Sequence, residues 1–208
     1  MKLLLSSFNT SPSQDAALAA MCGKPLTQLK IAYIENAHDV YDDEASLLEG
    51  RAELRAKGWE VELVDLRDWK ETHNRQALRQ ELAGKDVFVF AGGNPFYLRW
   101  LMKLSGADEI ITDLVRQGAV YAGASAGAVI AGPTLRFFDN QDDPNEAGEI
   151  IWDGLNLTPI VVIPHIDNEE FGVGCREAGE ALKAAGYTTW PITDAQALLI
   201  DGDHVEVI

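Results

Sequence analysis

Short apolar runs alternate with helical patterns along most of the 208-residue chain. Residues 87–90 are a continuous apolar run, which is typical of a parallel strand that is covered on both faces. Residues 44–57 instead carry apolar side chains at helical spacing and are followed by Gly58, a common helix end. Strands that alternate with helices predict a mainly parallel sheet between two helical layers. We therefore expect an α/β fold, a three-layer sandwich with a mainly parallel central sheet, in one domain over residues 1–208.

The same pattern predicts the other elements. Expected strands cover residues 2–8, 29–34, 59–66, 119–122, 160–164, 188–192, 197–200 and 205–208, with a hairpin turn at Asp201-Gly202 between the last two. Expected helices cover residues 76–83, 95–104, 107–117, 126–131 and 169–185. Ligands in such folds bind beyond the carboxyl ends of the strands, so the residues that follow each strand are the candidates for function.

Charge excludes one class of function. The chain has 33 acidic and 17 basic residues, a formal net charge of −16. A generally basic surface for DNA or RNA is therefore excluded, and docking on an anionic membrane is disfavoured. No apolar run reaches the roughly 18 residues of a membrane span, and the apolar start is too short for a signal peptide, so a cytoplasmic location is expected. Cys22 and Cys175 are expected to be reduced thiols, and no metal or organic cofactor is expected.

A nucleophile candidate follows the strand expected at residues 119–122. The segment Gly123-Ala124-Ser125-Ala126-Gly127 has the pattern G-x-S-x-G between a strand and a helix. A sharp turn there projects the serine hydroxyl, and the N–H of the next residue, Ala126, can stabilise an oxyanion. The alternative is a packing turn in which small residues only allow the helix to approach the strand closely.

A serine hydroxyl needs a base, and the chain has four histidines. His165 directly follows the strand expected at residues 160–164, which places it on the same sheet edge as Ser125. His38 is the main competitor, because it follows the second strand. His73 and His204 lie in polar stretches, and we expect both at the surface.

A catalytic histidine is oriented by an acceptor, and Asp194, just after the strand expected at residues 188–192, is the first choice. Asp139 and Asp167 are its rivals. The α/β-hydrolases have the order Ser, Asp or Glu, His, so a triad with Asp194 excludes that fold.

A glycine pair, Gly92-Gly93, separates the strand expected at residues 87–90 from a helix that starts near Pro95. Such a pair can expose a backbone N–H as a second oxyanion donor. A phosphate cradle is the weaker alternative, because neither common phosphate-binding glycine motif is present.

Together these motifs resemble the peptidase E family, the aspartyl dipeptidases and their relatives, including the cyanophycinases. The matching segments are residues 91–98 (AGGNPFYL), 123–128 (GASAGA), 132–136 (GPTLR), Pro164-His165 with Asn168, and 193–197 (TDAQA). The resemblance implies a flavodoxin-like fold similar to class I glutamine amidotransferase domains. It also implies Ser125 as nucleophile, His165 as base, and the backbone N–H groups of Gly93 and Ala126 as oxyanion donors.

The chain departs from the best-known members of this family in two places. Asp194 stands where those members have a glutamate as the third triad residue. Near the Pro-Thr-x-Arg segment they end in Asn-Asp, whereas this chain reads Asp139-Asn140.

Aspartyl dipeptidases must bind a substrate carboxylate, and an arginine fork is suited to that task. Arg176 is the first choice and Arg136 the second, and a surface salt bridge is the alternative for each. Further candidate substrate-binding residues are Gly92, Asn94 and Asn168.

The sequence thus predicts a serine peptidase of small peptides, with dipeptides that begin with Asp as the expected substrates. A small peptide is the expected partner, and neither nucleic acid nor membrane is expected; the oligomeric state is left open. The alternatives are another amide or ester hydrolase, or an amidotransferase-like enzyme, on the same fold, and a family member without catalytic activity.

Overall fold

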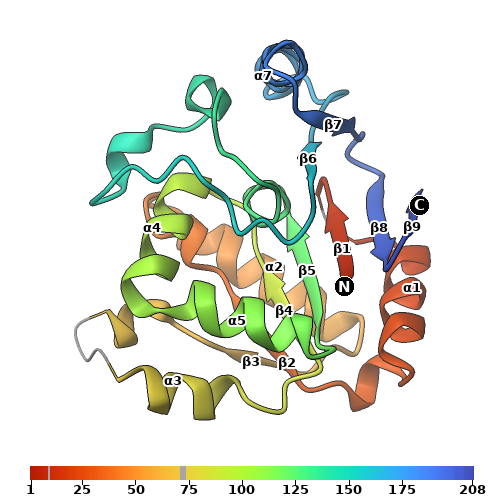
Figure 1. Cartoon of the computed structure of the whole chain (residues 1–208). Coiled ribbons are helices and arrows are strands. Elements are labelled where there is room, and N and C mark those ends of the chain that lie inside the picture. The colour runs from red at the N-terminus through yellow and green to blue at the C-terminus, as the bar shows by residue number, and fades with distance from the viewer. Residues whose placement is uncertain (9, 71–73) are drawn as a thin grey trace.

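A seven-stranded sheet forms the centre of the computed structural model, which describes residues 1–8, 10–70 and 74–208 (Figure 1). The strand order is β3-β2-β4-β5-β1-β8-β9. The first five of these strands are parallel, and β8 and β9 add an antiparallel hairpin at one edge. The strands are β1 (Lys2–Ser6), β2 (Ile31–Ile34), β3 (Val61–Leu63), β4 (Val87–Phe90), β5 (Val120–Ala124), β8 (Ala197–Asp201) and β9 (His204–Val207). The expected mainly parallel sheet is confirmed.

Helices pack on both faces of this sheet. On one face, α1 (Pro12–Cys22) and α2 (Glu44–Ala56) lie over a cluster that includes Leu4, Val87 and Ala122. On the other face lie α3 (Arg75–Leu82), α4 (Pro95–Ser105) and α5 (Ala107–Arg116). Among the described residues, short 3-10 helices lie in the connections, at Leu26–Gln28, Asn36–His38, Leu66–Trp69, Phe138–Asn140 and Pro144–Glu146.

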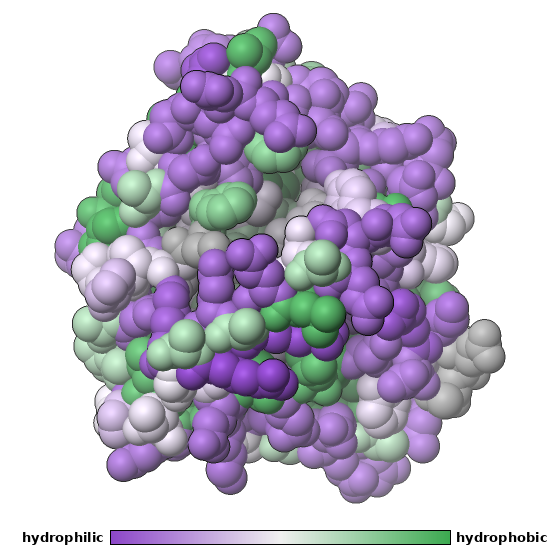
Figure 2. Space-filling model, turned by 180° about the vertical axis from the view of Figure 1, so that it is seen from behind, coloured by the Kyte–Doolittle hydropathy of each residue, from purple (hydrophilic) through white to green (hydrophobic). Residues whose placement is uncertain are grey.

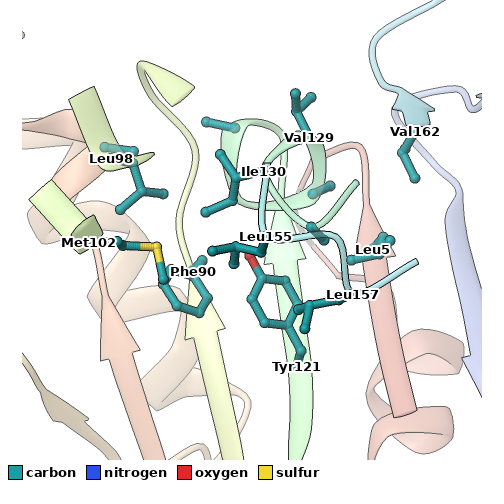
Figure 3. Close-up of a cluster of buried hydrophobic side chains, with 14 of the residues drawn as sticks. Leu5, Phe90, Leu98, Met102, Tyr121, Val129, Ile130, Leu155, Leu157 and Val162 are labelled. Atoms are coloured by element: carbon teal, nitrogen blue, oxygen red, sulfur yellow. The ribbon is translucent and has the colours of Figure 1, made fainter. Parts of the chain in front are cut away.

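The larger core cluster fills the face covered by α4 and α5. Figure 3 shows Phe90 of β4 and Tyr121 of β5 beside Leu98 and Met102 of α4, all of which are fully buried. The two aromatic rings stack with centroids 4.8 Å apart, and the Tyr121 hydroxyl donates a hydrogen bond to the carbonyl of Gly127. This core therefore holds the start of α6 (Ala126–Val129) firmly on the end of β5.

A second, two-stranded parallel sheet lies beyond the carboxyl ends of the central strands. It consists of β6 (Ile160–Ile163) and β7 (Thr188–Pro191), connected by α7 (Gly172–Ala184) (Figure 1). The expectation that His165 follows a strand of the same sheet as Ser125 is therefore wrong, because β6 pairs only with β7 among the described residues. His165 instead approaches Ser125 from this small sheet.

The other expected strands and helices are present, with ends that differ by a few residues. The expected helix at residues 169–185 begins at Gly172, and the hairpin turn lies at residues 202–203, one residue later than expected. Helix α1 was not expected, although Ser11 and Gln14 form a capping box at its start and Pro12 is its first residue. His73 lies outside the described residues.

Candidate active site

Ser125 lies on a strained turn between β5 and α6. Its backbone has φ 49° and ψ −113°, a conformation that residues with a Cβ rarely adopt. The turn depends on its glycines, because a Cβ on Gly123 would lie 2.3 Å from the carbonyl oxygen of Gly127. A Cβ on Gly127 would in turn lie 2.6 Å from the carbonyl oxygen of Phe90. The small residues of G-x-S-x-G are therefore required by the close approach of three backbone segments.

His165 follows β6 and is buried next to Ser125. Its Nε2 lies 2.9 Å from the Oγ of Ser125. Its backbone also has a positive φ, 59°, and Phe8 and Phe171 pack their rings against the imidazole. The ring is thus held in one orientation with Nε2 toward the serine.

Asp194 accepts a hydrogen bond from the other nitrogen of this imidazole. Its Oδ1 lies 2.5 Å from Nδ1 of His165, and its Oδ2 accepts a hydrogen bond of 2.8 Å from Nδ2 of Asn168. Burial by itself raises the pKa of this carboxyl, but the hydrogen bonds from Asn168, His165 and Ser7 bring the pKa below its ordinary value. Asp194 is therefore an anion at neutral pH, and the proton on Nδ1 leaves Nε2 free to accept one.

Ser7 joins this network, although it is not among the candidate residues expected from the sequence. It is fully buried, and its hydroxyl donates to Oδ1 of Asp194 over 3.0 Å. The Oγ of Ser7 also accepts a hydrogen bond of 2.7 Å from the backbone N–H of His165. One side chain thus ties the carboxylate to the backbone that carries the imidazole. Its position directly after β1 is the signal that was available, since the carboxyl ends of parallel strands meet at one edge.

The glycine pair lies opposite Ser125. A Cβ on Gly92 would lie 3.3 Å from the Cβ of Ser125. Gly93 has φ 131°, and a Cβ there would lie 2.3 Å from the carbonyl oxygen of Ala37. Asn94 is almost fully buried and caps α4: its Oδ1 accepts from the N–H groups of Phe96 and Tyr97, and its Nδ2 donates to the carbonyl of Asp143. Its amide therefore fixes the loop, and both glycines line the cavity together with Ser125.

A cavity of about 880 Å³ contains Ser125, His165 and both glycines. Figure 2 shows a face of the molecule that is hollowed near its middle. Four carboxylates line the cavity, from Asp43, Glu53, Asp142 and Glu170, whereas Lys57 is the only described lysine or arginine that does so. Lys57 already donates to the carbonyl and hydroxyl of Thr10. The cavity is therefore acidic, like the chain as a whole.

The carboxyl of Asp142 has a raised pKa. Burial raises its pKa to about 6, although a hydrogen bond from the Tyr41 hydroxyl and the positive charge of protonated His165 both lower it. Burial also raises the pKa of Cys175, another residue of the cavity wall, to about 11, with smaller contributions from Asp142 and Asp194. Cys175 is therefore a thiol, not a thiolate, at neutral pH.

The structure places the other candidate residues away from the reacting atoms. Arg136 is exposed, with its guanidinium 5.8 Å from the centre of the Trp152 ring, and Arg176 donates to the carbonyl of Ile166. Neither arginine lines the cavity. Asn168 contacts Asp194 and two backbone N–H groups.

The rival residues also differ in place. His38 lines the cavity but contacts the carbonyl of Asp43, Asp167 accepts from the backbone N–H of Asp194, and Asp139 is exposed. His204 is exposed, as expected.

Within the described part of the chain, no group of three or more His, Cys, Asp or Glu side chains could hold a metal ion. Over the same residues, no helix is long and apolar enough to cross a membrane.

Comparison with known proteins gives the family. The model of peptidase family S51 matches residues 3–208. The chain belongs to peptidase family S51. Membership in S51 makes it a hydrolase that acts as a serine peptidase, and it confirms the resemblance found in the sequence.

Individual relatives agree with this assignment. An uncharacterized peptidase of Listeria monocytogenes is 28% identical over 179 residues, 84% of this chain and 83% of that protein. Peptidase E of Escherichia coli is 37% identical over 83 residues, 40% of this chain and 35% of that protein. A crystal structure of a candidate peptidase E from Listeria monocytogenes superposes with a TM-score of 0.82 and 26% identity, covering 100% of this chain and 97% of that one.

Proposed function

We propose that this S51 member hydrolyses small peptides through a triad of Ser125, His165 and Asp194. The observation that carries the proposal is the continuous hydrogen-bonded chain from the Ser125 hydroxyl through both imidazole nitrogens to the Asp194 carboxylate. These hydrogen bonds end at Ser125, which lies on a strained turn and lines the 880 Å³ cavity, where a peptide bond can reach the Ser125 hydroxyl. A serine, a base and an orienting carboxylate in this geometry are the parts of nucleophilic acyl transfer.

The reaction follows from the positions of the protons. Ser125 Oγ attacks the scissile carbonyl carbon while Nε2 of His165 takes the hydroxyl proton. Asp194 stabilises the imidazolium that forms, and the backbone N–H groups of Gly93 and Ala126 stabilise the oxyanion. The imidazolium then gives its proton to the leaving amine, which leaves an ester on Ser125. A water molecule, deprotonated by His165, hydrolyses that ester and restores the serine.

The preference for peptides that begin with Asp stays a prediction. Because neither Arg136 nor Arg176 lines the cavity, an Asp side chain bound there would meet Lys57 as the only described lysine or arginine. If Arg176 nevertheless selects Asp, Arg176→Ala will lose cleavage of Asp-Xaa dipeptides far more than cleavage of neutral dipeptides. Equal losses would contradict that assignment. The class I glutamine amidotransferase-like arrangement likewise stays a prediction.

The direct test of the proposed function is hydrolysis of a set of dipeptides, with glutamine as a parallel substrate. We expect wild-type protein to release amino acids from dipeptides and Ser125→Ala to be inactive. Undiminished turnover by Ser125→Ala would refute the mechanism. Hydrolysis of glutamine without hydrolysis of any dipeptide would favour the amidase alternative.

A further inference from the structure

The cavity at Ser125 extends into a chamber beneath α2 that the triad and the oxyanion donors do not use. Its floor is one row of side chains across the central sheet. Leu4 pairs with Ala122, Ala122 with Val89, and Val89 with Tyr33, and all four line the cavity. Residues that pair in parallel strands point to the same face, so these side chains form a continuous surface. Ala122 lies between Leu4 and Val89 in this row and has the smallest side chain of the four.

The roof of the chamber is the inner face of α2. Its cavity-lining residues recur three and four positions apart, as one helix face requires: Ser46, Leu47, Gly50, Glu53, Leu54 and Lys57, the last just past the helix end. No residue of α2 is buried, although Leu47 and Leu54 face the sheet, whereas α1 on the same sheet face buries four residues. Leu54 packs against the buried cluster on this face of the sheet, whereas the rest of the inner face of α2 stands off the sheet and encloses open space.

The chamber joins the reaction site directly. Ser125 comes three residues after Ala122 in the chain, so at about 3.3 Å per residue the floor lies roughly 10 Å from the nucleophile along β5. The strand positions between them carry small side chains, Gly123 and Ala124, and Ser6 and Gly92 line the same stretch. A peptide whose carbonyl lies at Ser125 can therefore extend a side chain into the space below α2.

We propose that this chamber binds a large apolar side chain of the peptide substrate, on a residue next to the scissile bond. The proposal rests on the peptidase function proposed above and names its substrate class. Leu4, Val89 and Ala122 of the floor, Leu47 and Leu54 of the roof, and Trp59 at its edge offer mostly carbon surface. Transfer of an apolar side chain from water to such a surface is favourable in proportion to the area buried. The acyl residue and the leaving residue are the two positions that can supply the side chain.

The test compares two dipeptide series with the full-length protein, Xaa-Ala for the acyl residue and Asp-Xaa for the leaving residue, where Xaa is Ala, Leu or Phe. In one series we expect kcat/KM to be about 50-fold higher for Leu than for Ala, from the three extra carbons that become buried. The series that shows this ratio identifies which residue enters the chamber.

Gly50→Leu is the variant that fills the chamber. Gly50 lies within α2, and a Cβ there would meet only the Tyr33 hydroxyl, at 3.9 Å, so the substitution is compatible with the fold and favours the helix. We expect it to lower the ratio of Leu to Ala substrates to about one. Ala52→Leu makes a similar change at an exposed position of the same helix outside the cavity, and it should keep the wild-type ratio.

The proposal would be overturned if the preference for Leu over Ala persists in Gly50→Leu. It would also be overturned if the wild-type protein shows no such preference in either series. A binding measurement separates this result from failure of the proposed function. Calorimetry of the same peptides with Ser125→Ala protein needs no turnover. It should show that the Leu peptide binds more tightly than the Ala peptide, and adding Gly50→Leu should remove this difference. If Ser125→Ala still hydrolyses peptides, the triad is refuted while the chamber can still be judged by binding. Equal binding of Leu and Ala peptides refutes the chamber alone.

Discussion

Replacing Ser7 with alanine removes the hydroxyl that joins Asp194 to the backbone of His165. Three hydrogen bonds are lost: one of 3.0 Å to the carboxylate, one of 2.7 Å from the N–H of His165, and one of 3.3 Å between the hydroxyl and Nδ1 of His165. A hydrogen bond to a charged group contributes about 1.5–3 kcal/mol, so loss of this constraint on Asp194 should lower kcat by roughly 10- to 100-fold. The N–H of His165 is also left buried without its partner, and this costs about 1–3 kcal/mol of folding stability.

The assay is dipeptide hydrolysis at neutral pH together with thermal unfolding. We expect Ser7→Ala to unfold roughly 4–8 °C lower than wild type, for a loss of about 2 kcal/mol in a chain of this size. Ser105→Ala is the matched control, because Ser105 is also buried and its hydroxyl bonds only to backbone groups around the end of α4. It should lose comparable stability and keep its kcat. If Ser7→Ala loses stability like the control but keeps kcat within twofold, the positioning role of Ser7 is refuted.

Three further substitutions test other parts of the site. Asp194→Asn should lower kcat by about 10⁴-fold, because the amide can no longer hold His165 in the required tautomer; a loss below tenfold in steady-state kinetics would speak against the triad. Gly93→Ala places a Cβ 2.3 Å from the carbonyl oxygen of Ala37 at φ 131°, so we expect loss of activity and a clearly lower unfolding temperature, and an unchanged protein would contradict the account of this loop. The raised pKa of Asp142, about 6, means that the folded protein binds a proton more tightly than the unfolded chain, so stability from this group is lost as pH rises through 6. Asp142→Asn should therefore stabilise the protein at pH 8 by about 1–2 kcal/mol in denaturant titrations, with the gain disappearing near pH 4; an equal gain at both values would exclude this cause.

The sequence was most informative where local chemistry determines structure. The apolar run of β4 and the glycines that follow α2 and α3 located those elements because strand burial and left-handed helix ends depend on nearby residues. The G-x-S-x-G segment located the strained turn for the same reason, since only small residues allow its close backbone contacts.

What the sequence could not supply was the assembly of distant segments. The pairing of β6 with β7 in a separate sheet depends on tertiary packing, and a strand of four apolar residues looks the same in either sheet. Ser7 was missed because residues 2–8 were read as one strand, whereas β1 ends at Ser6 and leaves Ser7 free to turn toward Asp194. The positions of Arg136 and Arg176 outside the cavity are likewise a property of the folded chain.

The central claim is that Ser125 is a nucleophile activated by His165. Mass spectrometry of the protein after reaction with a fluorophosphonate probe tests it most directly. We expect one adduct per chain, on Ser125, which forms in step with loss of peptidase activity and does not form in His165→Ala. Peptidase activity that persists with Ser125 fully labelled, or a reactive protein whose adduct lies on another residue, would contradict it.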